Sequence, residues 1–198
     1  MLKAGIVGLG HGSRVLIDAF KMNNIEVFGV TSKNYSKAIL ISKKKKIKNT
    51  YRSWHDLIND KRIDIVAIAV PPYLQTEIIK KSIKNNKVLF CEKPVGSNYR
   101  EIKKIFDLLK NYKKSFLIDY IFPEHNAFKK FKKIIQKNEI NSNSLLNIKF
   151  FFKSYINQNK IVNWKSDTEK GGGILNLYLI HIIDYLVYFF GNVKKVNF

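Results

Sequence analysis

The first half of the chain alternates short apolar runs with stretches whose apolar positions recur at helical spacing. The runs are almost continuously apolar, which is typical of strands that are covered on both faces. They occupy residues 4–7, 25–30, 63–70 and 88–91, and the helical patterns occupy residues 15–22, 36–45, 74–85 and 99–113. This alternation predicts βαβ units, and therefore an α/β fold with a doubly wound parallel sheet.

The pattern changes near Pro123. A strand is expected before it, a helix and a second strand after it, and then a polar loop, a long apolar helix and a last strand. These elements are expected over residues 116–122, 128–135, 145–155, 157–170, 174–190 and 193–198. We therefore expect one domain over residues 1–122 and an incomplete α+β domain over residues 123–198.

Composition places the chain among globular proteins. Of its 198 residues 45% are hydrophobic, which is too many for a disordered basic tail, although 36 Lys+Arg against 15 Asp+Glu give a net charge of +21. The only arginines are Arg14, Arg52, Arg62 and Arg100. Specific base readout favours arginine, so we interpret the charge as lysines on solvated helix faces. A lysine-rich binder of nucleic acid or anionic surfaces remains the alternative of another class.

The single cysteine, Cys91, excludes an intramolecular disulfide framework and a multi-cysteine zinc site, so no metal ligands are predicted. The N-terminal apolar run is too short for a secretory signal. Residues 174–190 are slightly short of the roughly 20 that span a bilayer and include His181 and Asp184. We expect a cytoplasmic protein that does not enter a membrane.

A glycine-rich segment follows the first predicted strand and precedes a helix. It reads Gly8-Leu9-Gly10-His11-Gly12-Ser13. In a dinucleotide-binding turn, the first glycine allows a tight turn and the second lets the backbone approach a pyrophosphate at the helix N-terminus. Five residues are predicted to bind the cofactor here: Gly8, Gly10, His11, Gly12 and Ser13.

The end of the second strand bears on the choice between NAD and NADP. An acidic residue is expected there when the ribose 2′-hydroxyl is bound, but the chain continues as Ser32-Lys33. A hydroxyl beside a cation suits a 2′-phosphate, so these two residues favour NADP(H) over NAD(H). Lys33 as one more solvated lysine is the alternative.

Together, four segments resemble the Gfo/Idh/MocA family of NAD(P)-dependent oxidoreductases along nearly the whole chain. They are residues 8–13, the Pro71-Pro72 pair, Glu92-Lys93-Pro94, and the glycines 171–173 followed by His181 and Asp184. The resemblance implies a Rossmann domain followed by a substrate domain. It also implies hydride transfer between a nicotinamide and a hydroxyl or carbonyl of a sugar, cyclitol or nucleotide sugar.

Residue by residue, the resemblance implies that Lys93 is catalytic and lies near nicotinamide and substrate. It places Pro71 and Pro72 along the cofactor, and Glu92 is expected to orient either Lys93 or the cofactor ribose. It makes His181 the proton donor or acceptor. Asp184 either orients His181 or only packs in the helix. Asn176, together with Lys93 and His181, is expected on the substrate side.

The chain departs from the family's pattern at several positions. Leu177 stands where many members have a carboxylate four residues before the histidine, Leu179 replaces a glycine, and Gln75 replaces a histidine. Asn176 lies about 140° from His181 on a regular helix and cannot simply replace the carboxylate.

The chain also ends a hundred residues or more before most members do, with at most two strands for the second sheet. We expect a C-terminally truncated chain with exposed apolar surface, or one that needs a homo-oligomeric or other partner. The family's sheet-to-sheet oligomerisation would be impaired. A cofactor-binding remnant with impaired catalysis is the alternative function.

Overall fold

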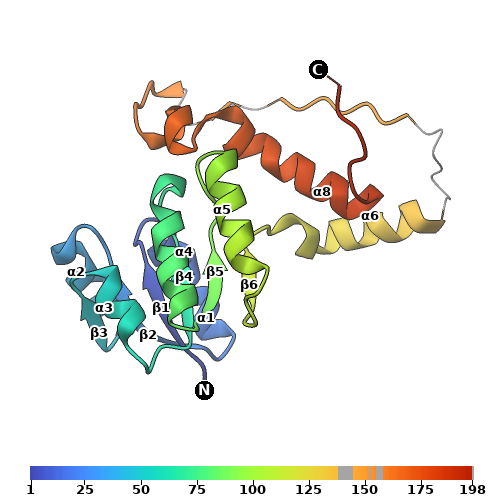
Figure 1. Ribbon diagram of the computed structural model, residues 1–198. Helices are drawn as coiled ribbons and strands as arrows, with labels where there is room; N and C mark the ends of the chain where they lie inside the picture. The colour runs from blue at the N-terminus through green and yellow to red at the C-terminus, as the bar shows by residue number, and fades with distance from the viewer. Residues whose placement is uncertain (138–144, 152, 155–157, 198) are drawn as a thin grey trace. The chain divides into compact units, whose positions relative to one another are not determined.

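The computed structural model describes residues 1–137, 145–151, 153–154 and 158–197 (Figure 1). Its residues form two compact units, each described here by itself. The first unit comprises Met1–Asp119 and Glu169–Gly171. The second comprises Tyr120–Thr168 and Gly172–Phe198.

A six-stranded parallel sheet forms the centre of the first unit. Its strands are β1 (Lys3–Val7), β2 (Glu26–Thr31), β3 (Asn49–Tyr51), β4 (Ile65–Ile68), β5 (Val88–Cys91) and β6 (Phe116–Ile118). Their order is β3-β2-β1-β4-β5-β6, and all neighbouring pairs are parallel. This order reverses direction between β1 and β4, where such sheets bind their ligands. The doubly wound α/β fold predicted from the sequence is confirmed.

Helices cover both faces of this sheet. One apolar cluster joins the sheet to α1 (Ile17–Met22) and α2 (Tyr35–Lys45). The other joins it to α3 (Trp54–Asn59), α4 (Gln75–Lys84) and α5 (Tyr99–Leu109), which lie in front of the sheet in Figure 1. Because both faces are buried, the strands carry the continuous apolar runs that predicted them.

Two short elements were not predicted. Strand β3 has three residues and is partly buried, and helix α3 has only six residues. Both are too short to show a periodic pattern, and tertiary packing stabilises them instead. In α3, the side chains of Leu57 and Ile58 are fully buried against the sheet.

The described residues of the second unit include two main helical segments. Helix α6 (Asn126–Lys137) is the helix predicted after Pro123. A π-type turn, η6 (Leu175–Leu179), continues directly into α8 (Ile180–Phe190), which ends at Gly191 with φ +87°. The ring of Phe189 stacks on Phe128 with centroids 5.4 Å apart.

Several predicted strands differ from the structure. Strand β6 stops at Ile118, and a short 3₁₀ turn, η3 (Phe122–Glu124), follows it. Residues 145–151, 153–154 and 193–197 form no strand, so those two strand predictions are wrong for the part described. Phe152, Tyr155 and Phe198, which the same predictions included, lie outside the described residues. With neither predicted strand formed, Phe151 is 88% and Val193 59% exposed.

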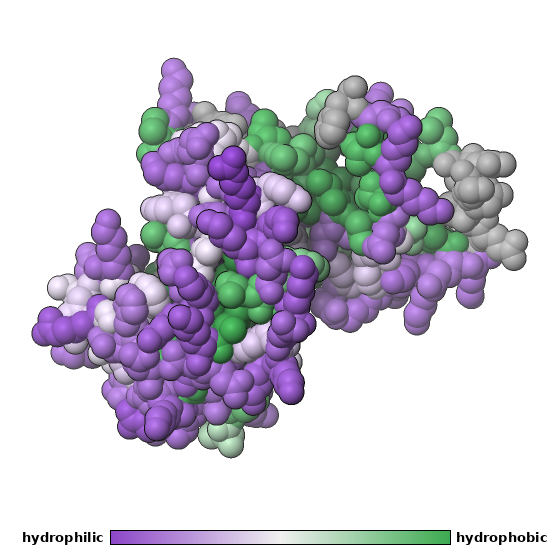
Figure 2. Space-filling view, in the orientation of Figure 1, coloured by the Kyte–Doolittle hydropathy of each residue, from purple (hydrophilic) through white to green (hydrophobic). Residues whose placement is uncertain are grey.

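Lysines account for the surface character of the first unit. Figure 2 shows mostly hydrophilic side chains over its visible face. In the last turn of α2, for example, Lys43 and Lys44 are exposed. This placement agrees with the interpretation of solvated helix faces.

One helical stretch of the described chain, Thr168–Phe190, is long and apolar enough to cross a membrane by length and composition alone. Core helices of soluble proteins pass the same test, so this criterion is weak. The stretch also contains His181 and Asp184, which are costly inside a bilayer.

Candidate functional site

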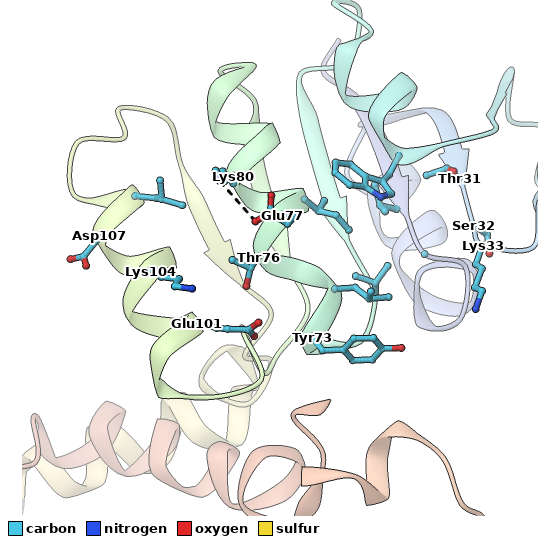
Figure 3. A pocket seen from close by; sticks show the side chains of 17 residues that line it. Thr31, Ser32, Lys33, Tyr73, Thr76, Glu77, Lys80, Glu101, Lys104 and Asp107 are labelled. Carbon is cyan, nitrogen blue, oxygen red and sulfur yellow. Dashed lines mark ion pairs between the residues drawn. The ribbon is translucent and has the colours of Figure 1, made fainter. Parts of the chain in front are cut away.

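A cavity of about 950 Å³ lies at the carboxyl ends of the first strands of the sheet (Figure 3). Val7 and Gly8 contribute from the end of β1, and Thr31, Ser32 and Lys33 contribute from the end of β2. The remaining wall comes from residues of α3, α4 and α5 and from the segment after β4: Trp54, Val70, Tyr73, Leu74, Thr76, Glu77, Ile78, Lys80, Glu101, Lys104, Asp107 and Leu108. The cavity therefore lies on the edge of the sheet where dinucleotides bind in this class of fold.

The glycine-rich turn has the backbone that its sequence predicts. Gly8 has φ +99°, and a Cβ atom there would lie 2.3 Å from the carbonyl oxygen of Ala69. A Cβ on Gly10 would meet nothing within 4 Å, so the backbone at Gly10 is open to a ligand. The hydroxyl of Ser13 donates to the carbonyl oxygens of Leu9 at 2.7 Å and Gly10 at 3.2 Å. Ser13 thus stabilises the turn at the position where the motif usually has a glycine.

Two side chains at the end of β2 line the same cavity as Gly8. Ser32 is partly buried and Lys33 is exposed, and both are labelled in Figure 3. No carboxylate stands between Thr31 and Asn34, whose side chain caps α2 by accepting from the Lys37 backbone N–H. Ser32 and Lys33 can bind either a ribose 2′-phosphate or a ribose 2′-hydroxyl. They therefore fit both NADP and NAD.

Lys93 follows β5 and is partly buried. The peptide bond between Lys93 and Pro94 is cis. Of the two prolines expected along the cofactor, Pro72 is fully buried, and the cavity wall is formed by its neighbours Val70 and Tyr73. A Cβ on Gly171 would lie 2.7 Å from the Cβ of Pro72, so a glycine is required where the chain passes this proline.

Three ionisable side chains meet near the ends of β1, β5 and β6. The Nε2 atom of His11 lies 2.9 Å from Oε1 of Glu92, and one polar atom each of His11, Glu92 and Asp119 lie within 4.8 Å of one another. Burial, followed by the nearby charge and hydrogen bond of Asp119, raises the pKa of Glu92 to about 8, against the opposing charge of Lys93. A carboxyl that is protonated near neutral pH can share its proton with Asp119.

A shared proton removes the repulsion between two carboxylates, whose oxygens lie within 4.8 Å of each other here. One imidazole and two carboxyls at this spacing are also a set of ligands that a divalent cation accepts. Asp119 was not among the predicted site residues. Its signal was its place directly after β6, because the carboxyl ends of parallel strands share one edge of the sheet.

His181 lies in the second unit, on α8. The ring of Phe122 lies edge-on to it at a centroid distance of 5.0 Å, and the ring of Tyr120 at 6.2 Å. Burial and the charge of Asp184 raise the pKa of Tyr120 to about 12, and burial also raises the pKa of Asp184. Sequence reasoning missed Tyr120, which no motif marks.

The helix before His181 is not regular, which corrects one prediction. Residues Leu175–Leu179 form a π-type turn, in which hydrogen bonds join residues i and i+5. The angle of about 140° between Asn176 and His181 assumed 3.6 residues per turn, so it does not apply across this turn. Asn176 and Leu177 precede His181 by five and four residues, the spacings that hydrogen bonds join in a π-helix and in an α-helix.

The structure thus groups the predicted site residues in two sets. Gly8, Ser32 and Lys33 line the cavity of the first unit, and His11 contacts Glu92, the neighbour of Lys93, in the same unit. His181 and Asn176 belong to the second unit. Asp119 lies beside His11 and Glu92 in the first unit, and Asp184 follows His181 by three residues in the second.

The chain belongs to the Gfo/Idh/MocA oxidoreductase family. It matches the family's NAD-binding Rossmann fold over residues 2–120 and its C-terminal alpha/beta domain over residues 132–198.

Among curated relatives, an uncharacterized oxidoreductase of Synechocystis is 25% identical over 98% of this chain and 53% of its own length. An inositol 2-dehydrogenase of Salmonella agona is 30% identical over 70% of this chain and 43% of its own length. The chain therefore spans about half the length of these relatives.

Solved structures show the same fold. Levoglucosan dehydrogenase in complex with NADH and levoglucosan superposes with a TM-score of 0.81 at 21% identity, over 96% of this chain and 54% of that chain. An NAD-binding oxidoreductase from Klebsiella pneumoniae gives 0.82 at 19% identity over the same shares.

Proposed function

We propose that the chain is an NAD(P)-dependent oxidoreductase that acts on a hydroxyl or carbonyl group of a sugar, cyclitol or nucleotide sugar in the cytoplasm. The observation that carries the proposal is the Gly8 turn, which opens into the same cavity as Ser32 and Lys33. A tight turn, an open backbone at Gly10 and a cavity at the reversal point of the sheet are what a dinucleotide requires. Relatives named as inositol and levoglucosan dehydrogenases support the substrate class.

Each group of site residues has a distinct role in the proposed reaction. The backbone of the turn binds the pyrophosphate, while Ser32 and Lys33 bind the adenosine side. When bound, the nicotinamide supplies or accepts the hydride. Lys93 carries a positive charge that polarises a carbonyl or stabilises an alkoxide as the hydride moves. His181 exchanges the proton of the substrate hydroxyl.

The decisive experiment combines binding with turnover. NADPH and NADH are titrated into the protein by fluorescence, and cyclitols, sugars and nucleotide sugars are then screened for nicotinamide oxidation or reduction. We expect micromolar cofactor binding and turnover with at least one substrate class. Binding without turnover would support the alternative of a remnant that holds the cofactor but does not catalyse.

Substitution of Lys93 tests its proposed role, and the same substitution at Lys84 is the matched control. Lys93→Met should abolish turnover and leave cofactor affinity within about threefold, because the ammonium acts on the reacting carbonyl. Lys84→Met, at the exposed end of α4, should leave both unchanged. Equal activity of the two variants would exclude the role proposed for Lys93.

A further inference from the structure

Gln75, the first residue of α4, has a side chain that is almost completely buried, with 1% exposed. Its Nε2 donates to the carbonyl oxygen of Glu92 at 3.0 Å and to that of Val70 at 3.3 Å. Its Oε1 accepts from the backbone N–H of Gly96 at 3.2 Å. All three partners are backbone groups. The amide therefore fixes the path of the backbone at these points and does not bind another side chain.

The partners of two of these bonds lie on either side of Lys93 in the sequence. One partner, the carbonyl of Glu92, immediately precedes Lys93, and the other, the N–H of Gly96, follows it by three residues. Beyond these points the chain is fixed again: the N–H of Glu92 donates to Ile68 in β4, and the N–H of Ser97 donates to the Glu101 carboxylate. The buried amide of Gln75 thus bonds to the backbone on both sides of Lys93.

The third bond connects this segment to the cavity. Val70, whose carbonyl also accepts from Gln75, lines the cavity together with Gly8. The same amide therefore joins the residues after β4, beside the glycine-rich turn, to the segment after β5. A side chain with two donors and an acceptor, all engaged, can fix both segments at once.

We propose that Gln75 is a positioning residue. Its amide holds the backbone on both sides of Lys93 and so sets where the ammonium group of Lys93 lies relative to the glycine-rich turn. This rests on the proposed function, in which Lys93 acts on the reacting carbonyl. Buried backbone groups that lose their partner are costly, so without the amide the segment rearranges until they find other partners. Lys93 then moves with its backbone.

Three variants separate positioning from mere stability. Gln75→Leu keeps the approximate volume and removes all three bonds. Gln75→His restores one donor and one acceptor, enough for Glu92 and Gly96, but only while the imidazole is neutral. Ser82→Ala is the matched control, because Ser82 is also fully buried on α4 and its hydroxyl has no hydrogen-bond partner among the described residues.

In turnover, we expect Gln75→Leu to lower kcat at least tenfold and to change the KM for the cofactor less than threefold, since the misplaced group acts on the reaction and not on cofactor binding. Gln75→His should recover kcat to within threefold above pH 7.5. Below about pH 6.5, where protonation removes the acceptor, its kcat should fall more steeply than that of the native protein. Ser82→Ala should match the native protein.

Two readouts do not depend on catalysis. Hydrogen exchange of the Gly96 amide should accelerate at least tenfold in Gln75→Leu, because its acceptor is gone. The rate at which Lys93 is acylated by an amine reagent, followed by mass spectrometry, should change at least threefold in Gln75→Leu and not in Ser82→Ala.

The outcomes separate this inference from the proposed function. If the protein turns over none of the substrates, the proposed function fails, while exchange at Gly96 and acylation of Lys93 still decide whether Gln75 positions this segment. Unchanged exchange and acylation in Gln75→Leu would overturn the inference, whatever the activity. Altered exchange with unchanged kcat would also overturn it, since Gln75 would then be structural only.

Discussion

The imidazole Nε2 of His11 lies 2.9 Å from Oε1 of Glu92, which connects the glycine-rich turn after β1 to the segment that carries Lys93. A carboxylate oxygen of Asp119, after β6, lies within 4.8 Å of both groups. Three strand ends are therefore linked through ionisable side chains at the cofactor edge of the sheet. The protonation of this cluster is expected to affect stability as well as binding.

Stability should fall as pH rises through the range in which Glu92 titrates. The pKa of Glu92 is raised to about 8 in the folded protein from an ordinary value of 4.5. Below pH 4.5 both states are protonated, and between 4.5 and 8 the unfolded state loses a proton that the folded state retains. This group thus lowers the free energy of unfolding by up to about 1.4 kcal/mol per pH unit in that range.

Glu92→Gln tests this linkage, because the amide keeps the shape and can donate to Asp119 without titrating. In urea unfolding between pH 5 and pH 8, the variant should gain stability over the native protein as pH rises. Glu77→Gln, at a side chain that is 71% exposed, should leave the native slope unchanged. A slope that is the same in Glu92→Gln and the native protein would contradict the raised pKa.

Gly8 and Gly10 should respond to the same substitution in different ways. Gly8→Ala forces a Cβ into a position with φ +99° and 2.3 Å from the Ala69 carbonyl, so we expect a loss of about 2–4 kcal/mol in unfolding free energy. Gly10→Ala meets nothing, so stability should stay within about 0.5 kcal/mol. Its methyl group would instead occupy the approach to the pyrophosphate and weaken cofactor binding at least tenfold.

Thermal unfolding and cofactor titration of both variants provide the measurement. Unchanged cofactor affinity in Gly10→Ala would show that the pyrophosphate does not approach this turn. Equal destabilisation by the two substitutions would contradict the difference in space around them.

Lys33 should distinguish the two cofactors. If its ammonium binds a 2′-phosphate, Lys33→Ala loses a charge-assisted bond and about tenfold in NADPH affinity, equivalent to about 1.4 kcal/mol, while NADH affinity changes less than twofold. Lys37→Ala is the control, since Lys37 is also exposed but does not line the cavity. Equal losses for both cofactors in Lys33→Ala, or tighter binding of NADH by the native protein, would exclude the NADP preference.

The sheet could be predicted from sequence because burial on both faces leaves a local signal: every residue of β4, for example, is buried and apolar. Strand β3 has no such signal, because its residues are only partly buried and pair with β2 alone. In their described residues, the two strands expected in the second half do not form, for a related reason. Their aromatic and β-branched residues favour a sheet, but a strand forms only beside a partner strand.

The site was predictable where a motif fixes the backbone, as at Gly8, and not where side chains from distant segments meet. Asp119 lies 27 positions after Glu92 and 108 after His11, so only the sheet topology brings the three together. Gln75 is the same case. In sequence it was a departure from the family's histidine. Its bonds to the backbone of Glu92 and Gly96, 17 and 21 positions away, are visible only in the structure.

The missing carboxylate before His181 leads to the last prediction, a gain of function. A carboxylate one helical turn before an imidazole orients it and stabilises its protonated form, and assistance of this kind raises the rate of general acid–base catalysis. Leu177→Asp should therefore raise kcat/KM at least about tenfold and shift the acidic limb of its pH profile to higher pH. Leu177→Asn, which is polar but uncharged, should give neither effect. The π-type turn adds a second condition, because the α-helical angle of about 140° between residue 176 and His181 does not apply across it. Asn176→Asp should then produce a comparable gain, whereas on a regular helix it would produce none.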